Sequence, residues 1–196
     1  MVLKKAIFLD KDGTLIPNVP YSVDPEQAAI TLDTAKALRV FAKLGYQIFI
    51  VSNQSGVARG YFHEEQVDLV VQRFHELFLL LGISLQGFYY CPHHPEGKAP
   101  YNIDCACRKP KPGMIIQAAQ EHSIDLANSW LIGDILHDVE AGRRAGCRTV
   151  LVDNGGETEW KLSCDRLPHH VVTNLLDAAL IVAALHVPRL PIQYLL

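Results

Sequence analysis

Two aspartates separated by one residue give the first indication of chemistry. Asp10 and Asp12 directly follow the apolar run 6–9, and Gly13 comes next. Side chains at positions i and i+2 of a turning chain can converge on one pocket, and a loop glycine lets the backbone approach a ligand closely. A solvated turn or a calcium loop is the alternative. A helix–loop–helix calcium site needs a helix before Asp10 and a glutamate at the loop end, and the sequence contains neither.

Four later polar residues stand where they could join the two aspartates: Ser52, Lys109, Asp134 and Asp138. Ser52 and Asp134 each follow a short apolar run, and Lys109 lies just ahead of a predicted helix. Taken singly, each has a structural explanation. Ser52 could cap a helix, Lys109 could be a surface lysine, and the two aspartates could favour the start of a helix. The order of the whole set is what indicates a catalytic pocket.

A stretch rich in cysteine and histidine precedes Lys109. Cys91, His93, Cys105 and Cys107 offer four soft or borderline ligands, which suit a closed tetrahedral zinc site. His94 is an alternative to His93, and reduced, half-buried cysteines are the alternative to a metal. Four protein ligands leave no open position for water, so the zinc would be structural. Metal binding would order an irregular segment that leads directly into the two cations after Cys107.

Short apolar runs alternate with helical patterns along most of the chain. Alternation of this kind favours an α/β domain, with helices on both faces of a parallel sheet and the active crevice at the carboxyl ends of the strands. We expect one domain, residues 1–186, with a metal-binding loop at about 91–107 and an apolar tail, 187–196. The predicted strands are 6–9, 47–51, 87–90, 129–132 and 148–152, and the predicted helices are 34–44, 64–81, 112–122, 135–145 and 175–185.

The composition excludes several classes of function. The chain has 196 residues, a net charge of -3 and a pI near 6.3, so it has no basic footprint for nucleic acid. No apolar run approaches the roughly 18 residues that cross a bilayer. The N-terminus has no signal-peptide pattern, so we expect a mature start and a cytoplasmic protein. Five cysteines, an odd number, argue against a disulfide framework.

These motifs, in this order, resemble the haloacid dehalogenase (HAD) superfamily of phosphatases. Asp10-x-Asp12-Gly13-Thr14-Leu15 resembles the first motif and Ser52 the hydroxyl residue of the second; Lys109 resembles the third-motif lysine and Gly133-Asp134-x-x-x-Asp138 the acidic fourth. The resemblance implies a Rossmann-like, three-layer α/β/α fold and a magnesium-dependent phosphomonoester hydrolase.

The same resemblance implies a role for each position. Mg²⁺ would be bound by the Asp10 side chain, the Asp12 backbone carbonyl and the Asp134 side chain. Asp10 would attack phosphorus and form an aspartyl phosphate, while Asp12 would act as general acid and base. The remaining positions would stabilise the transferring phosphoryl group or support the metal and the lysine: Ser52, Lys109 and Asp138.

A narrower resemblance, to D-glycero-D-manno-heptose 1,7-bisphosphate 7-phosphatases and the related histidinol-phosphate phosphatases, rests on residues 52–60, 89–95 and 105–110. It implies loops over the site in place of a large cap domain, and removal of the 7-phosphate from the heptose bisphosphate. The implied substrate-binding residues are Asn18, Tyr21, Asn53, Gln54 and Arg108, the last for a distal phosphate.

The chain departs from this pattern at three places. Ser52 replaces the commoner threonine, Ile135 stands where the heptose enzymes often have lysine, and Val19-Pro20-Tyr21 replaces a glycine–tyrosine loop. Histidinol-phosphate phosphatase is therefore an alternative function, and a zinc-stabilised binding module without catalysis is a second. Processing of nucleic-acid 3′-phosphates is disfavoured by the acidity of the chain. We expect a small phosphorylated metabolite as partner, and a monomer or a small homo-oligomer.

Overall fold

A parallel sheet of six strands forms the centre of the molecule. The computed structural model describes residues 3–161 and 163–186, so the apolar tail expected at 187–196 lies outside the described residues. The strand order is β3-β2-β1-β4-β5-β6, and every neighbouring pair is parallel. The strands are β1 (Ala6–Leu9), β2 (Gln47–Asn53), β3 (Leu85–Cys91), β4 (Trp130–Gly133), β5 (Arg148–Val152) and β6 (His170–Val172).

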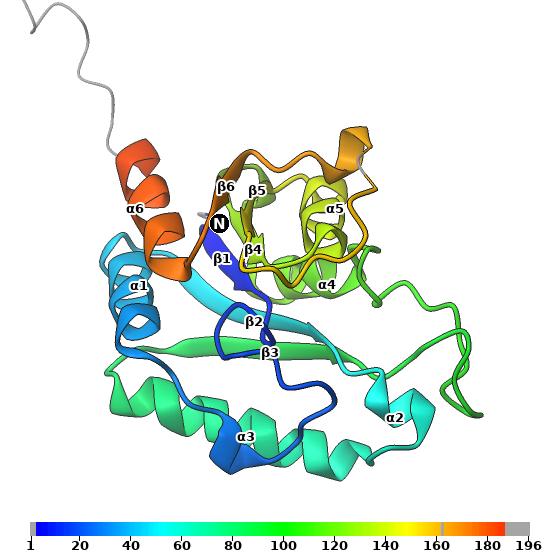
Figure 1. The fold of residues 1–196 in the computed structure, drawn as a ribbon. Helices are drawn as coiled ribbons and strands as arrows, with labels where there is room; N and C mark the ends of the chain where they lie inside the picture. Colours follow the sequence, from blue (N-terminus) through cyan, green and yellow to red (C-terminus); the bar gives the residue numbers. More distant parts are fainter. Residues whose placement is uncertain (1–2, 162, 187–196) are drawn as a thin grey trace, which may run out of the picture.

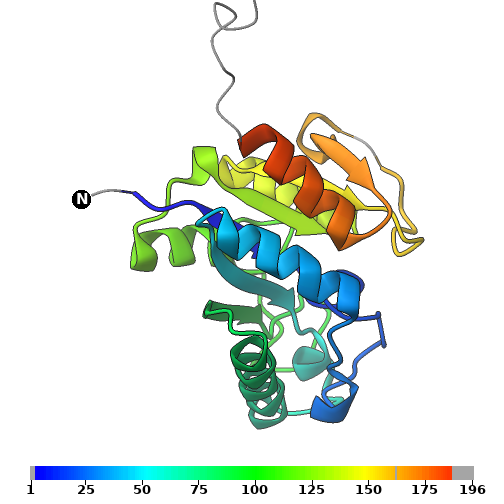
Figure 2. The same cartoon turned by 90° about the vertical axis from the view of Figure 1, so that its left-hand side faces the viewer.

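Helices cover both faces of this sheet (Figure 1). Helices α1, α3 and α6 lie on one face and α4 and α5 on the other, and α1 and α6 run side by side (Figure 2). The predicted three-layer α/β/α architecture is thereby confirmed. The helices are α1 (Leu32–Lys43), α2 (Gly56–Arg59), α3 (Glu64–Leu80), α4 (Gly113–His122), α5 (Leu136–Ala145) and α6 (Leu175–His186), with short 3₁₀ turns η1 (Pro25–Gln27), η2 (Leu126–Asn128) and η3 (Cys164–Arg166).

Alternation along the strands builds two separate apolar layers. Ile7 and Leu9 of β1 belong to the core beneath α1, α3 and α6. Phe8, between them, faces the other way and stacks on Phe49 of β2 with ring centroids 5.3 Å apart. Because both faces are covered, the buried parts of the strands carry consecutive apolar residues, as in Ala6–Leu9 of β1, and the sequence shows short continuous apolar runs there.

The chain reverses its direction of travel across the sheet between β1 and β4. From β1 it proceeds outward through β2 to β3, and from β4 outward through β5 to β6. Leu9 pairs with Ile132, and the Asp10 amide donates to the Ile132 carbonyl at 3.0 Å. Open α/β sheets bind ligands at such a reversal, outside the carboxyl ends of the strands. The fold therefore places Asp10 and Asp134 side by side at the expected position.

Three features differ from the sequence expectations. The short edge strand β6 and the one-turn helix α2 were not predicted. The second strand continues to Asn53, so Ser52 lies inside it and not after it.

No large cap domain occurs among the described residues, as expected. Among the helices in that part of the chain, none combines the length and the apolar character needed to cross a membrane.

Candidate active site

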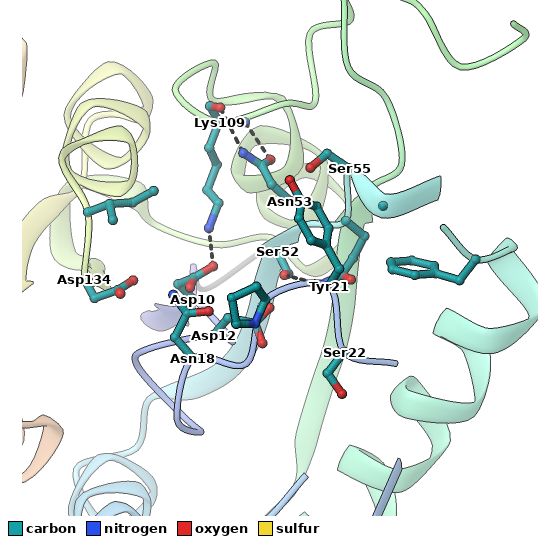
Figure 3. A pocket seen from close by; sticks show the side chains of 15 residues that line it. Asp10, Asp12, Asn18, Tyr21, Ser22, Ser52, Asn53, Ser55, Lys109 and Asp134 are labelled. Carbon is teal, nitrogen blue, oxygen red and sulfur yellow. Dashed lines mark hydrogen bonds and ion pairs between the residues drawn. The ribbon is translucent and has the colours of Figure 1, made fainter. Parts of the chain in front are cut away.

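Lys109 connects two of the predicted acidic residues at the centre of the site. Its Nζ lies 2.5 Å from Asp10 Oδ1 and 2.6 Å from Asp138 Oδ1, and it donates to the Val51 carbonyl at 2.9 Å. The lysine is buried, which by itself lowers the pKa of its ammonium group, but the two carboxylates more than offset burial and the pKa is raised. Lys109 therefore stays charged and holds the Asp10 carboxylate in one orientation (Figure 3).

A third buried carboxylate, that of Asp134, lies beside the two that pair with Lys109. Asp10, Asp134 and Asp138 each offer an oxygen, all within 4.8 Å of one another. Burial raises the pKa of Asp10 to about 6, partly offset by Lys109. Burial and the neighbouring charges of Asp10 and Asp138 raise the pKa of Asp134 to about 8. The cluster thus has more negative charge than Lys109 neutralises, and its all-oxygen donor set fits a hard divalent cation such as Mg²⁺.

Asp12 lies at the mouth of this cluster and has a different environment. Its carboxylate pairs with Lys11 Nζ at 2.7 Å, and Lys11 is itself buried. Burial raises the pKa of Asp12, while Lys11 opposes the rise. A carboxyl group whose pKa is raised toward neutrality can both give and take a proton, which suits a general acid and base.

The glycine after Asp12 allows the loop to approach the Asp134 carboxylate. Gly13 has a φ of +80°, and a Cβ at this position would collide with the Asp134 carboxylate. Asn154 Nδ2 donates to the Gly13 carbonyl and fixes the loop from the β5 side. A residue with a side chain would therefore be strained and would displace Asp134.

Residues at the end of β2 hold the lysine segment and the nearby hydroxyl. Asn53 Nδ2 donates to the Lys109 carbonyl at 3.0 Å, and the Lys109 amide donates to Asn53 Oδ1 at 3.1 Å (Figure 3). Gln54 Nε2 donates to Ser52 Oγ at 2.8 Å. Asn53 thus fixes the backbone from which the ammonium extends, a role that the sequence did not indicate.

A cavity of about 380 Å³ opens in front of these residues. Most of the sequence-predicted catalytic and substrate residues line it: Asp10, Asp12, Asn18, Tyr21, Ser52, Asn53, Gln54, Lys109 and Asp134. Six further residues line the cavity: Pro20 and Ile135, which belong to the departures noted in the sequence, and Ser22, Ser55, Gly56 and Phe62, which were not predicted. The four that were not predicted lie in the segments that follow β1 and β2, and this position was the only available signal for them. The cavity is large enough for a phosphorylated metabolite.

Comparisons with known proteins agree with this geometry. A HAD-hydrolase-like family model matches residues 106–178. The D-glycero-β-D-manno-heptose-1,7-bisphosphate 7-phosphatase of Pasteurella multocida is 45% identical over 154 residues, which cover 78% of this chain and 84% of the relative. The chain belongs to this family of HAD-like phosphatases.

Two further similarities place the phosphatase in the same group. The 7-phosphatase of Haemophilus influenzae is 43% identical, again over 78% of this chain and 84% of the relative. A crystal structure of the D,D-heptose 1,7-bisphosphate phosphatase from B. bronchiseptica, complexed with magnesium and phosphate, covers 92% of this chain and 98% of its own at a TM-score of 0.75 and 28% identity.

The cysteine–histidine loop of the phosphatase forms a second, separate cluster. The three sulfur atoms of Cys91, Cys105 and Cys107 lie 3.1–3.3 Å apart, and His93 Nδ1 lies 3.6 Å from Cys107 Sγ and 3.8 Å from Cys91 Sγ. All three cysteines are free, so they form no disulfide. Three sulfurs and one imidazole nitrogen around a common centre fit a tetrahedral zinc ion.

The structure distinguishes the two candidate histidines of the phosphatase. His93 faces the sulfur cluster, whereas the ring of His94 contacts Arg59 Nη2 at 3.3 Å and accepts from the Glu96 amide. Arg108 does not line the catalytic cavity; its Nη1 donates to the His93 carbonyl at 3.2 Å. The expected substrate role of Arg108 therefore stays a prediction, and the structure places its guanidinium close to the cysteine–histidine cluster.

Proposed function

We propose that this phosphatase hydrolyses the 7-phosphate of D-glycero-D-manno-heptose 1,7-bisphosphate. The observation that carries the proposal is the buried group of Asp10, Lys109, Asp134 and Asp138 at the base of the cavity. The substrate is proposed from the relatives of Pasteurella multocida and Haemophilus influenzae, which are heptose-1,7-bisphosphate 7-phosphatases.

The chain's own residues would perform the reaction in two steps. An Asp10 oxygen attacks phosphorus while the bond from phosphorus to the sugar oxygen breaks, and Asp12 gives its proton to that oxygen. In the second step Asp12 takes a proton from water, the water oxygen attacks phosphorus, and the bond from phosphorus to the Asp10 oxygen breaks, which releases phosphate and restores the carboxylate. Lys109 and Ser52 face the transferring oxygens and stabilise their charge. The pKa of Asp12, raised by burial, favours both of its proton transfers.

Two metal ions would bind to the protein, each at a separate cluster of side chains. Asp10, Asp134 and the Asp12 backbone would hold magnesium, with Asp138 in support through Lys109. Magnesium neutralises charge where a phosphate dianion meets a carboxylate. Cys91, His93, Cys105 and Cys107 would hold a structural zinc ion. On the substrate side, Asn18, Tyr21, Asn53 and Gln54 line the cavity, and Arg108 would bind the distal phosphate.

Phosphate release from three substrates tests the proposal. We expect kcat/KM to be at least about tenfold higher for heptose 1,7-bisphosphate, assayed as both anomers, than for histidinol phosphate, because a distal phosphate engages an arginine that an imidazole cannot. Heptose 7-phosphate serves as the matched substrate that lacks the distal phosphate. A preference for histidinol phosphate would establish the alternative substrate, and no turnover on a wide panel of phosphate esters would indicate a binding module.

A further inference from the structure

Glu64, at the start of α3, joins two tyrosines from separate segments. Its Oε1 accepts from the Tyr101 hydroxyl at 2.7 Å, and its Oε2 accepts from the Tyr90 hydroxyl at 3.0 Å. The pKa of Tyr101 is raised by its hydrogen bond to Glu64, and that of Tyr90 by burial and by the same carboxylate. Both hydroxyls therefore remain protonated donors. Tyr90 belongs to β3, and Tyr101 lies within the loop that contains the cysteine–histidine cluster.

Tyr101 is central to the fold of that loop. Its carbonyl accepts from the His94 amide at 3.1 Å, and its own amide donates to the Lys98 carbonyl at 2.9 Å. Its ring lies 6.1 Å from the ring of His93, measured between centroids. His93 in turn holds Arg108 through its carbonyl at 3.2 Å. A continuous series of contacts therefore runs from Glu64 through Tyr101 and His93 to the Arg108 guanidinium.

The segment around Glu64 also forms one wall of the catalytic cavity. Phe62, two residues earlier, lines that cavity. It packs with Val57 and Val67 in a small cluster, against which the rings of Tyr90 and Tyr101 also pack. The contacts of Glu64 thus lie between the cavity wall and the loop, and they join the two.

We propose that Glu64, Tyr90 and Tyr101 form a latch that fixes the cysteine–histidine loop against α3 and so positions Arg108 beside the cavity. The latch acts from outside the metal cluster: zinc would order the loop internally, whereas Glu64 sets where the ordered loop lies. Glu64 is accordingly a positioning residue. The consequence for substrate binding rests on the proposed function, while the consequence for the loop does not.

The chain offers a matched control for testing the latch. Tyr89, next to Tyr90 on β3, also donates its hydroxyl to a glutamate, Glu121 of α4, at 2.5 Å. Tyr89→Phe and Tyr101→Phe therefore remove the same chemical group and the same kind of bond, but only the second touches the latch. Glu64→Gln is the companion variant; it keeps one acceptor oxygen, so its effect should be smaller than that of a complete loss of both bonds.

Two measurements on the full-length protein decide the matter: amide hydrogen exchange of residues 92–104, and kinetics with heptose 1,7-bisphosphate and with p-nitrophenyl phosphate. In Tyr101→Phe we expect exchange about tenfold faster and KM for the bisphosphate about fivefold higher, with kcat for p-nitrophenyl phosphate within about twofold of wild type. Tyr89→Phe should match wild type in amide exchange, in KM for the bisphosphate and in kcat for p-nitrophenyl phosphate.

Each other outcome has a definite meaning. Unchanged exchange in both Tyr101→Phe and Glu64→Gln overturns the latch. Faster exchange together with an equal loss of activity on both substrates overturns the positioning of Arg108. The contacts of Glu64 would then serve the structure of the loop alone. Faster exchange in a protein that does not hydrolyse heptose bisphosphate even as wild type overturns the proposed function and leaves the latch intact, because the exchange measurement needs no substrate.

Discussion

At the scale of single residues, the site is organised by charge balance. Lys109 neutralises part of the charge of Asp10 and Asp138, and its ion pairs orient the carboxylate that faces the cavity. Asp134 has no ammonium of its own within the cluster, and its pKa is raised further than that of Asp10. Asp134 is therefore the group that gains most from a bound divalent cation.

Replacing the proposed nucleophile tests the arrangement directly. Asp10→Asn keeps the shape of the side chain but removes its nucleophilic oxygen, so we expect phosphate release to fall by about 10³-fold or more. The variant should remain folded, because it removes one of three buried like charges. The control is Asp33→Asn, an exposed aspartate on α1 paired with Lys36. Turnover of Asp10→Asn at the wild-type rate would exclude this residue as the nucleophile.

The types of the polar residues and their order along the chain predicted more of this site than helix and strand propensities could. Asp10, Asp12, Lys109 and Asp134 were predictable because each follows a strand or precedes a helix in a recognisable order. The two hydrogen bonds between the Asn53 side chain and the Lys109 backbone could not be predicted, because they join positions 56 residues apart in the chain. A sequence states which side chains are present, but contacts to a distant backbone depend on the path of the folded chain.

At the scale of elements, the carboxyl end of β2 positions the lysine segment. Asn53→Ala removes two hydrogen bonds from the backbone of Lys109 and leaves that amide and carbonyl without their partners. We expect a loss of about 1–3 kcal/mol in the free energy of unfolding, and a kcat at least about tenfold lower as the ammonium moves from Asp10. Denaturant unfolding and single-turnover kinetics measure the two effects. Unchanged kcat in a destabilised variant would show that the hydrogen bonds of Asn53 to Lys109 serve stability alone.

The position of the cysteine–histidine loop next to Arg108 and Lys109 leads to a separate prediction at this scale. Cys107 directly precedes Arg108 and Lys109, so removal of zinc should loosen both cations and lower activity while the sheet remains folded. Activity should return on addition of zinc and not of magnesium. Cys105→Ser should lose metal, measured by elemental analysis, whereas Cys164→Ser should retain it because Cys164 is exposed and outside the cluster. A zinc-free, folded protein with full turnover would contradict this prediction.

At the scale of the whole molecule, the strand order brings the separated motifs together. The parallel sheet could be predicted because buried strands and amphipathic helices alternate along the chain. The edge strand β6 could not, since it has three residues and Val171 within it is exposed, so its apolar pattern is too short. The order of the strands and the reversal between β1 and β4 were not predicted, because no local pattern encodes strand order.

The stability of the whole chain should depend on pH and magnesium together. In the folded protein the pKa of Asp10 is about 6 and that of Asp134 about 8, both above the ordinary value of 3.8. Between about pH 4 and pH 8 the folded state therefore binds more protons than the unfolded state, and these two groups make the metal-free protein less stable as pH rises. Magnesium requires the ionised carboxylates, so its stabilising effect should grow over the same range.

Thermal unfolding with and without saturating magnesium, at pH 5.5 and at pH 7.5, measures this coupling. We expect a larger rise in Tm from magnesium at pH 7.5, and about tenfold weaker binding for each pH unit below the pKa of Asp134. Asp134→Asn removes the carboxyl with the larger shift, so it should flatten the pH dependence of the metal-free Tm and abolish most of the magnesium effect. Equal magnesium stabilisation at both pH values, in wild type and in Asp134→Asn, would mean that these buried carboxylates do not bind the ion.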